Sequence, residues 1–280
     1  MELTPIGSIL RSLWFLVACL AIGVASYFIY RARGWKRKGV WTIIILGLFG
    51  FFSLKNWIKE REQASYAREA WAHFKKLCDE KSGVKILQTF TDVRSVFVVR
   101  GLPPAREEDL YDQYWYGDPY SDATPWDKRA KSVATMLTLD SRDKNGIRKG
   151  LDFVEIEKSK TTPSKFEIIR KPTTYRDKAL VEEIEQPISR YGIAWEDIST
   201  PTDRKYWVAG SRLRLIDRQD NSLVAERIGY FIEAGFGSKA GQRRPWLASR
   251  GPDTTCPPLT GGDYSDSWFV TSVFKQEGRQ

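Results

Sequence analysis

Two apolar runs near the N-terminus, separated by a basic turn, form the strongest pattern in the chain. Neither Leu13–Tyr30 nor Val40–Leu54 contains a charged residue. A helix needs roughly 20 apolar residues to cross a hydrocarbon core of about 30 Å, and the second run reaches that length if Lys55 extends toward the headgroups. The pattern predicts a transmembrane hairpin over residues 1–58, with helices at about 13–30 and 40–57 and a basic turn at 31–38.

Two other structures compete with this hairpin. A buried soluble pair of helices is one, although soluble helices rarely stay apolar on every face. A lipoprotein signal peptide is the other, because Leu16–Cys19 resembles a lipidation motif. Arg11 leaves only about four apolar residues before that motif, fewer than the roughly 7–15 of a signal core. The membrane hairpin is therefore the better interpretation, with Cys19 as a thiol inside the membrane.

Basic residues predict how the hairpin is oriented. Five of the eight residues in 31–38 are Lys or Arg, whereas the preceding tail holds only Arg11. The positive-inside rule places the turn in the cytoplasm, which predicts a bacterial inner-membrane protein with its C-terminal domain in the periplasm. The net charge of +9 owes much to this region, since residues 1–58 hold seven of the 44 basic residues and one of the 35 acidic residues. A nucleic-acid-binding surface is therefore not predicted.

Residues 59–81 are predicted to form a connecting helix that continues the second span. Its apolar positions recur every three or four residues, at Ala64, Ala67, Trp71, Phe74 and Cys78. The dipeptide Ser82-Gly83 is typical of a helix end. His73 is the only histidine of the chain and has no candidate partner at ligand spacing, so a structural or solvent-facing role is predicted.

Patterns typical of β-strands dominate the rest, which predicts an α+β domain over residues 82–280 with a mostly antiparallel sheet and a packed helix. Strands are predicted at 84–90, 95–100, 132–140, 151–158, 165–170, 191–198, 206–217, 223–233 and 267–274, and a short helix at 178–185. The clearest hairpin joins 206–217 to 223–233. A register with Asp217 opposite Leu223 would place Arg214 opposite Glu226.

Residues 109–127 combine six aromatic side chains with five aspartates. Tyr and Trp are over-represented at binding hot spots, so one interpretation is a loop that contacts a protein partner. The other is an ordered loop whose rings fill gaps over the sheet. The segment 243–246 could join the same surface. The candidate partner-binding residues are Tyr111, Tyr114, Trp115, Tyr116, Asp118, Tyr120, Trp126, Arg243, Arg244 and Trp246.

Cys78 and Cys256 are the only cysteines of the predicted periplasmic domain. An oxidising compartment favours their pairing, so a disulfide is predicted, with two unpaired cytosolic thiols as the alternative. No catalytic, metal or nucleotide motif is present, and the loop Gly235–Gly241 lacks dinucleotide spacing. We predict no catalytic residue, metal, cofactor or small-molecule ligand.

Three stretches resemble parts of uncharacterised membrane-anchored proteins of proteobacteria: residues 77–86, 113–120 and 206–214. The resemblance covers the soluble domain and implies no known activity. Small membrane-anchored proteins of this architecture sometimes neutralise toxins delivered into the periplasm. The first hypothesis is therefore a non-enzymatic protein that binds a periplasmic protein partner, with immunity to a secreted toxin as its specific form. The alternatives are a carboxylate-dependent envelope hydrolase and a structural subunit of a cell-envelope complex.

Overall fold

The computed structural model divides the chain into two compact units, residues 1–65 and 66–280. Each unit is considered by itself. The described residues are 23, 27, 30, 31, 34–100, 106–115, 151–159, 165–170, 180–247, 251–258 and 266–275.

One helix, α2 (Trp35–Lys81), covers the predicted second apolar run and the predicted connecting helix without interruption. It begins directly after Gly34, whose φ is +98°, so the turn is shorter than the predicted 31–38. Within the described part of the chain, no helix has both the length and the apolar character needed to cross a membrane. Most of the first apolar run lies outside the described residues, and the transmembrane hairpin stays a prediction.

The predicted end of α2 at Ser82-Gly83 is confirmed. The Ser82 backbone N–H donates to the Leu77 carbonyl at 3.2 Å, and its hydroxyl donates to the Cys78 carbonyl at 2.7 Å. Gly83 has a φ of +155°, in a region that L side chains rarely adopt. The chain can therefore leave the helix here and enter the first strand.

The C-terminal part of α2 packs on the sheet, as predicted. It buries Ala70, Phe74 and Leu77 in a cluster that includes Tyr230 and Ile232. Trp71, which the periodicity placed on the buried face, is instead 36% exposed and contacts Phe74 edge-on.

The predicted disulfide between Cys78 and Cys256 is present, with its Cα atoms 5.6 Å apart. Cys256 lies on strand β10 (Thr255–Cys256), which pairs with the long strand β9 (Ser222–Ile232). The disulfide therefore joins the last turns of α2 to the sheet covalently.

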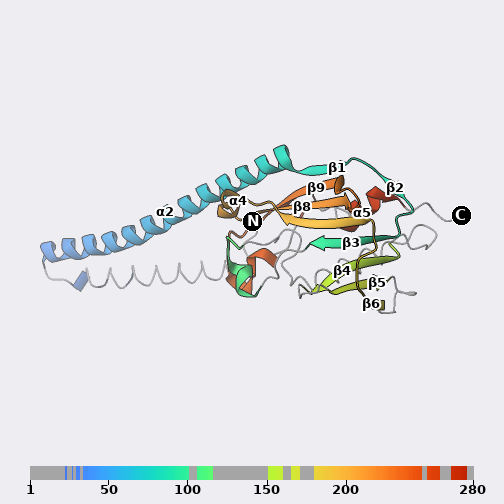
Figure 1. Cartoon of the computed structure of the whole chain (residues 1–280). Coiled ribbons are helices and arrows are strands. Elements are labelled where there is room, and N and C mark those ends of the chain that lie inside the picture. The colour runs from blue at the N-terminus through green and yellow to red at the C-terminus, as the bar shows by residue number, and fades with distance from the viewer. Residues whose placement is uncertain are drawn as a thin grey trace, which may run out of the picture. The chain divides into compact units, whose positions relative to one another are not determined.

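Within the described residues, the main sheet has nine strands in the order β1-β9-β8-β7-β3-β4-β5-β6, with β10 paired to β9 (Figure 1). Strand β3 is parallel to both of its neighbours, and the other pairs are antiparallel. This confirms an α+β domain with a mostly antiparallel sheet. Besides β9 and β10, the strands are β1 (Gly83–Ile86), β3 (Ser95–Arg100), β4 (Phe153–Ser159), β5 (Lys165–Arg170), β6 (Leu180–Ile184), β7 (Tyr191–Asp197) and β8 (Val208–Asp217).

The predicted hairpin is formed by β8 and β9, and Arg214 does lie opposite Glu226. A bulge after Leu215 shifts the register, so Asp217 lies opposite Ser222 rather than Leu223. The ion pairs run diagonally, with Arg214 at 3.2 Å from Glu196 and Glu226 at 3.2 Å from Arg212. Sheet twist rotates neighbouring strands, which favours such diagonal contacts between long side chains.

Two predicted elements are wrong. Residues 178–185 were expected to be helical, but Leu180–Ile184 forms β6, because pairing with β5 outweighs local propensity. Residues 267–274 were expected to be a strand, but α5 (Asp266–Val273) is a helix that buries Phe269, Val270 and Val273 in the main core. That spacing fits one helix face better than one strand face.

The segment 84–90 is divided between two strands. Its first residues belong to β1, and its end contributes Phe90 to β2 (Phe90–Thr91), which pairs in parallel with β11 (Phe274–Lys275). The predicted strand 132–140 lies outside the described residues.

Candidate functional site

Aromatic and lysine side chains from four separate segments gather on one surface of the second unit. We call this surface the tyrosine patch and define it by Tyr66, Tyr111, Tyr114, Tyr206, Lys205 and Lys239. Its parts come from α2, from the 3-10 helix η1 (Glu108–Tyr111) and the residues after it, from the end of α4 (Pro201–Lys205), and from the loop after β9. The patch thus depends on the tertiary fold rather than on one contiguous loop.

The backbone carbonyl of Lys205 ties three of these segments together. The Tyr66 hydroxyl donates to it at 2.5 Å, and the Gln113 side-chain amide donates to it at 2.6 Å. The Tyr66 ring also lies 5.9 Å from the Tyr206 ring and 5.5 Å from the Phe236 ring, measured between centroids. Burial raises the pKa of Tyr66, while the nearby Gln113 side chain opposes that rise, so the hydroxyl is a stable donor at neutral pH.

Two lysines stand over tyrosine rings of the patch. The Lys205 ammonium is 5.6 Å from the centroid of Tyr206, and the Lys239 ammonium is 5.2 Å from the centroid of Tyr111. Both distances are within the range of a cation–π contact. Both lysines are exposed, and Tyr114 is 57% exposed. The patch therefore presents the Tyr114 side chain, the two lysine ammonium groups and parts of the other three tyrosines to its surroundings.

Trp246 lies in the interior and contacts the backbone that carries the tyrosine patch. It is fully buried, its indole N–H donates to the Asp112 carbonyl at 2.7 Å, and its ring lies 5.1 Å from that of Trp207. The Arg204 guanidinium lies 5.0 Å from its centroid and forms a buried ion pair with Asp197. Trp246, a predicted partner-binding residue, is therefore in the interior, where it holds the backbone between Tyr111 and Tyr114.

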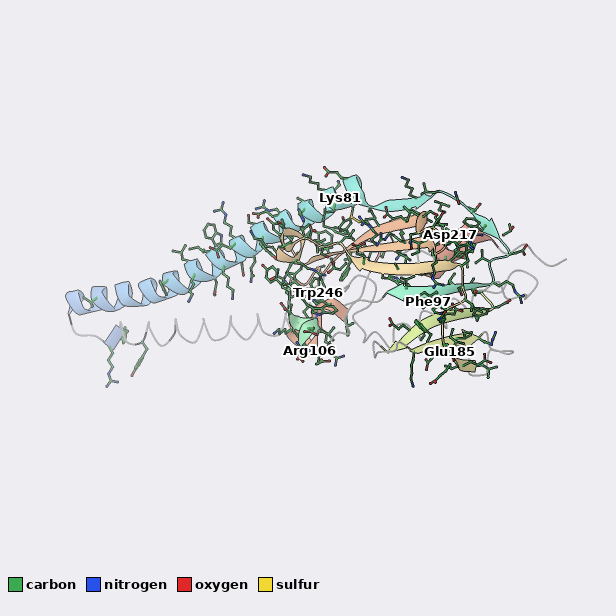
Figure 2. All side chains as sticks on the ribbon, in the orientation of Figure 1. Lys81, Phe97, Arg106, Glu185, Asp217 and Trp246 are labelled. Atoms are coloured by element: carbon green, nitrogen blue, oxygen red, sulfur yellow. A yellow bond between two sulfur atoms is a disulfide. The ribbon has the colours of Figure 1, made fainter. Side chains whose placement is uncertain are left out.

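Figure 2 labels Trp246 and, near it, Arg106 of the segment 106–115. The other predicted partner-binding residues have different positions. Trp115 is half-buried against the cluster that contains Trp246. Arg243 pairs with the buried Glu233, and Arg244 pairs with Glu107 at 2.8 Å. The structure thus brings the segments 106–115 and 243–247 together, with both arginines engaged in ion pairs. The remaining candidates lie outside the described residues: Tyr116, Asp118, Tyr120 and Trp126.

Sequence analysis missed Tyr66, Tyr206 and both lysines of the patch. Tyr66 occupies the apolar face of a helix, and Tyr206 precedes a strand, so each has the pattern of an ordinary packing residue. The only signal in the sequence was the density of aromatic residues in 109–127. It identified one of the four segments.

His73 has a partner that the sequence did not predict. Its Nε2 atom lies 2.6 Å from an Asp203 carboxylate oxygen, and its ring lies 5.2 Å from that of Tyr206. The second Asp203 oxygen accepts the Thr200 backbone N–H at 2.7 Å, as part of the capping box that begins α4. The histidine–carboxylate pair therefore connects α2 to α4, which is a structural role for His73, as predicted.

Two fully buried carboxylates of the domain serve as hydrogen-bond acceptors for the backbone. Glu155 accepts the N–H groups of Ile188 and Ser189, each at 3.0 Å. Glu233 accepts those of Gly235 at 2.8 Å and Gly237 at 2.7 Å. The glycine-rich loop therefore directs two of its N–H groups at the chain's own carboxylate, which explains its conformation without a bound phosphate.

Among the described residues, no group of three or more His, Cys, Asp or Glu side chains could hold a metal ion. Comparisons of the chain with protein-family models, curated proteins and solved structures found no match.

Proposed function

We propose that the chain is a membrane-anchored, non-catalytic binding protein whose domain captures a protein partner through the tyrosine patch. The observation that carries the proposal is the convergence of four tyrosines and two lysines from four segments. Tyrosine rings supply a large contact area at a low cost in side-chain entropy, and tyrosine is enriched at binding hot spots. The Tyr66 ring is also fixed by its hydroxyl hydrogen bond and by its contacts with Tyr206 and Phe236.

Membrane anchoring is proposed from the two apolar runs and the basic turn between them. A periplasmic location of the domain is supported by the disulfide between Cys78 and Cys256, because disulfides persist in oxidising compartments. A partner that reaches the periplasm from outside the cell would meet the domain there. Neutralisation of a secreted toxin is the specific form of the proposal.

A carboxylate-dependent hydrolase has less support. Glu155 and Glu233, the two fully buried carboxylates among the described residues, accept hydrogen bonds from backbone N–H groups. The Asp203 carboxylate is committed to His73 and to the start of α4. A general acid or base needs a carboxyl group that can reach substrate.

Photo-crosslinking in intact cells tests the binding surface. A benzoylphenylalanine at position 114 is expected to form adducts with a partner protein, because Tyr114 is the most exposed tyrosine of the patch. The same probe at position 188, where Ile188 is 74% exposed, is the matched control. Changing Tyr111 and Tyr114 together to Ala should weaken binding of the captured protein by tenfold or more, roughly the loss of one hot spot.

Equal adducts at both positions, or adducts at neither, would refute the patch as the binding surface. Capture of a partner at constant stoichiometry from cells that have met no toxin would favour a structural subunit over an immunity protein. Turnover of an envelope substrate by the purified chain, abolished by changing one carboxylate, would favour the hydrolase.

Thiol labelling in intact cells tests the location. A membrane-impermeant maleimide is expected to label Cys78 and Cys256 only after a reductant is added, because the disulfide protects both thiols. Labelling that requires cell lysis but no reductant would place the domain in the cytoplasm. The periplasmic proposal and the immunity proposal would then both fail.

A further inference from the structure

Three apolar side chains in the first unit share one exposed stripe of α2. Leu54, Trp57 and Ile58 are separated by three and four residues, so they lie on the same side of the helix. Their exposed fractions are 55%, 54% and 43%. A soluble helix usually turns such a stripe toward a core. This stripe therefore needs an apolar environment outside the described structure.

The stripe ends at an arginine that stacks on its tryptophan. The Arg61 guanidinium lies 5.1 Å from the centroid of the Trp57 ring, one helical turn further along the chain. A comparable pair occurs at the end of the first apolar run, where Arg31 donates to the Tyr27 hydroxyl at 3.1 Å. In both pairs the aromatic residue lies near the end of a predicted membrane helix, and the arginine follows it by four residues.

We propose that Arg61, held on the Trp57 ring, binds the phosphate of a phospholipid headgroup and thereby sets the depth of the helix at the membrane surface. This inference rests on the membrane anchoring proposed above. Trp rings concentrate at the headgroup level of a bilayer, where one part of the ring is apolar and the N–H is hydrated. The stripe would face the acyl chains next to the same headgroups.

The chemistry of the pair favours a phosphate over other anions of the interface. A guanidinium offers a planar set of N–H donors that matches two phosphate oxygens at once. Arg61 is exposed, so its N–H donors can reach a ligand while the guanidinium lies beside the Trp57 ring. Lys55 and Lys59, both exposed and within two turns of Arg61, add positive charge that complements the headgroup layer.

Lipid crosslinking with the full-length chain tests the site. Benzoylphenylalanine at position 58, next to Trp57, is reconstituted in vesicles of equal parts phosphatidylethanolamine and digalactosyl diacylglycerol. Neither lipid carries a net charge, and only the first has a phosphate. Phospholipid adducts are expected to exceed galactolipid adducts by about threefold, a ratio typical of one exposed charge-assisted contact.

Two variants separate the phosphate contact from simple charge. Arg61→Gln should bring the adduct ratio to about one, because the donor fork is lost. Lys59→Gln removes the same charge without disturbing the pair with Trp57, and should leave the ratio unchanged. A ratio that is equal in the wild type and in Arg61→Gln would overturn the phosphate site, while the lipid adducts themselves would still support the anchor.

A complete absence of lipid adducts at position 58 would count against the anchor as well. Adducts with a protein in their place would assign the stripe to a protein contact, which also overturns the inference. Failure of the lipid site and failure of the anchor therefore give different results.

Discussion

Replacing Cys78 and Cys256 together by Ala is expected to lower the free energy of unfolding by about 5 kcal/mol. The two residues are 178 positions apart, so the disulfide closes most of the domain into one loop. In the chain-entropy description, a crosslink that closes a long loop restricts the unfolded ensemble strongly. Cys256 is also buried beside Phe74 and Leu77, so loss of its sulfur removes packing. Urea unfolding of the detergent-solubilised chain, followed by near-UV circular dichroism, measures the change.

Two comparisons make this result specific. Reduced wild-type protein should unfold at nearly the same urea concentration as the double variant, since both lack the crosslink. Cys19→Ala should match the oxidised wild type, because Cys19 takes no part in the disulfide. A double variant within about 1 kcal/mol of the oxidised wild type would mean that the crosslink contributes little beyond the contacts around it.

The parts of this fold that sequence analysis predicted are those set by neighbouring residues. The end of α2 follows from Ser82-Gly83. The Ser82 hydroxyl donates to the Cys78 carbonyl, and Gly83 adopts a positive φ. The β8–β9 hairpin follows from two strand-forming segments joined by a short polar turn. The register assumed for it places Arg214 opposite Glu226, as observed, although the bulge after Leu215 places Asp217 opposite Ser222. The pairing of Cys78 with Cys256 was predicted because they are the only two cysteines of the domain, not because of their spacing.

The parts that sequence analysis missed are set by distant neighbours. Leu180–Ile184 is a strand because β5 supplies its hydrogen-bond partners. α5 differs, because the spacing of Phe269, Val270 and Val273 already fits one helix face, and that face then fills one side of the core. The His73–Asp203 contact spans 130 residues and leaves no local trace. Local propensity cannot distinguish these outcomes when the decisive contact is long-range.

The candidate site shows the same division. Aromatic density in 109–127 identified one segment, whereas Tyr66 and Tyr206 became part of the patch only through tertiary contacts. Trp246 shows the opposite case. Its position beside two arginines resembles an exposed binding motif, yet its ring is fully buried, because Trp207 and Arg204 enclose it.

Changing Trp246 to Ala is expected to destabilise the domain by about 3–5 kcal/mol, the range found when a fully buried aromatic side chain is removed. The variant loses the ring contacts with Trp207 and Arg204 and removes the donor that holds the Asp112 carbonyl. Because Asp112 lies between Tyr111 and Tyr114, we also expect loss of partner crosslinking at position 114. Urea unfolding measures the first effect, and crosslinking at a temperature where the variant is still folded measures the second.

A matched substitution separates packing from the hydrogen bond. Trp246→Phe keeps an aromatic ring in the interior but cannot donate to Asp112, so its cost should be smaller than that of Ala. If the hydrogen bond positions the patch, the Phe variant will be well folded and still lose much of the crosslinking at position 114. If crosslinking survives in both variants, the indole does not position the patch. The hydrogen bonds of Tyr66 and Gln113 to the Lys205 carbonyl would then be enough to position it. Substitutions at the buried Trp246 and at the exposed Tyr114 therefore test the same surface. The patch can bind a partner only while Trp246 keeps its backbone in position.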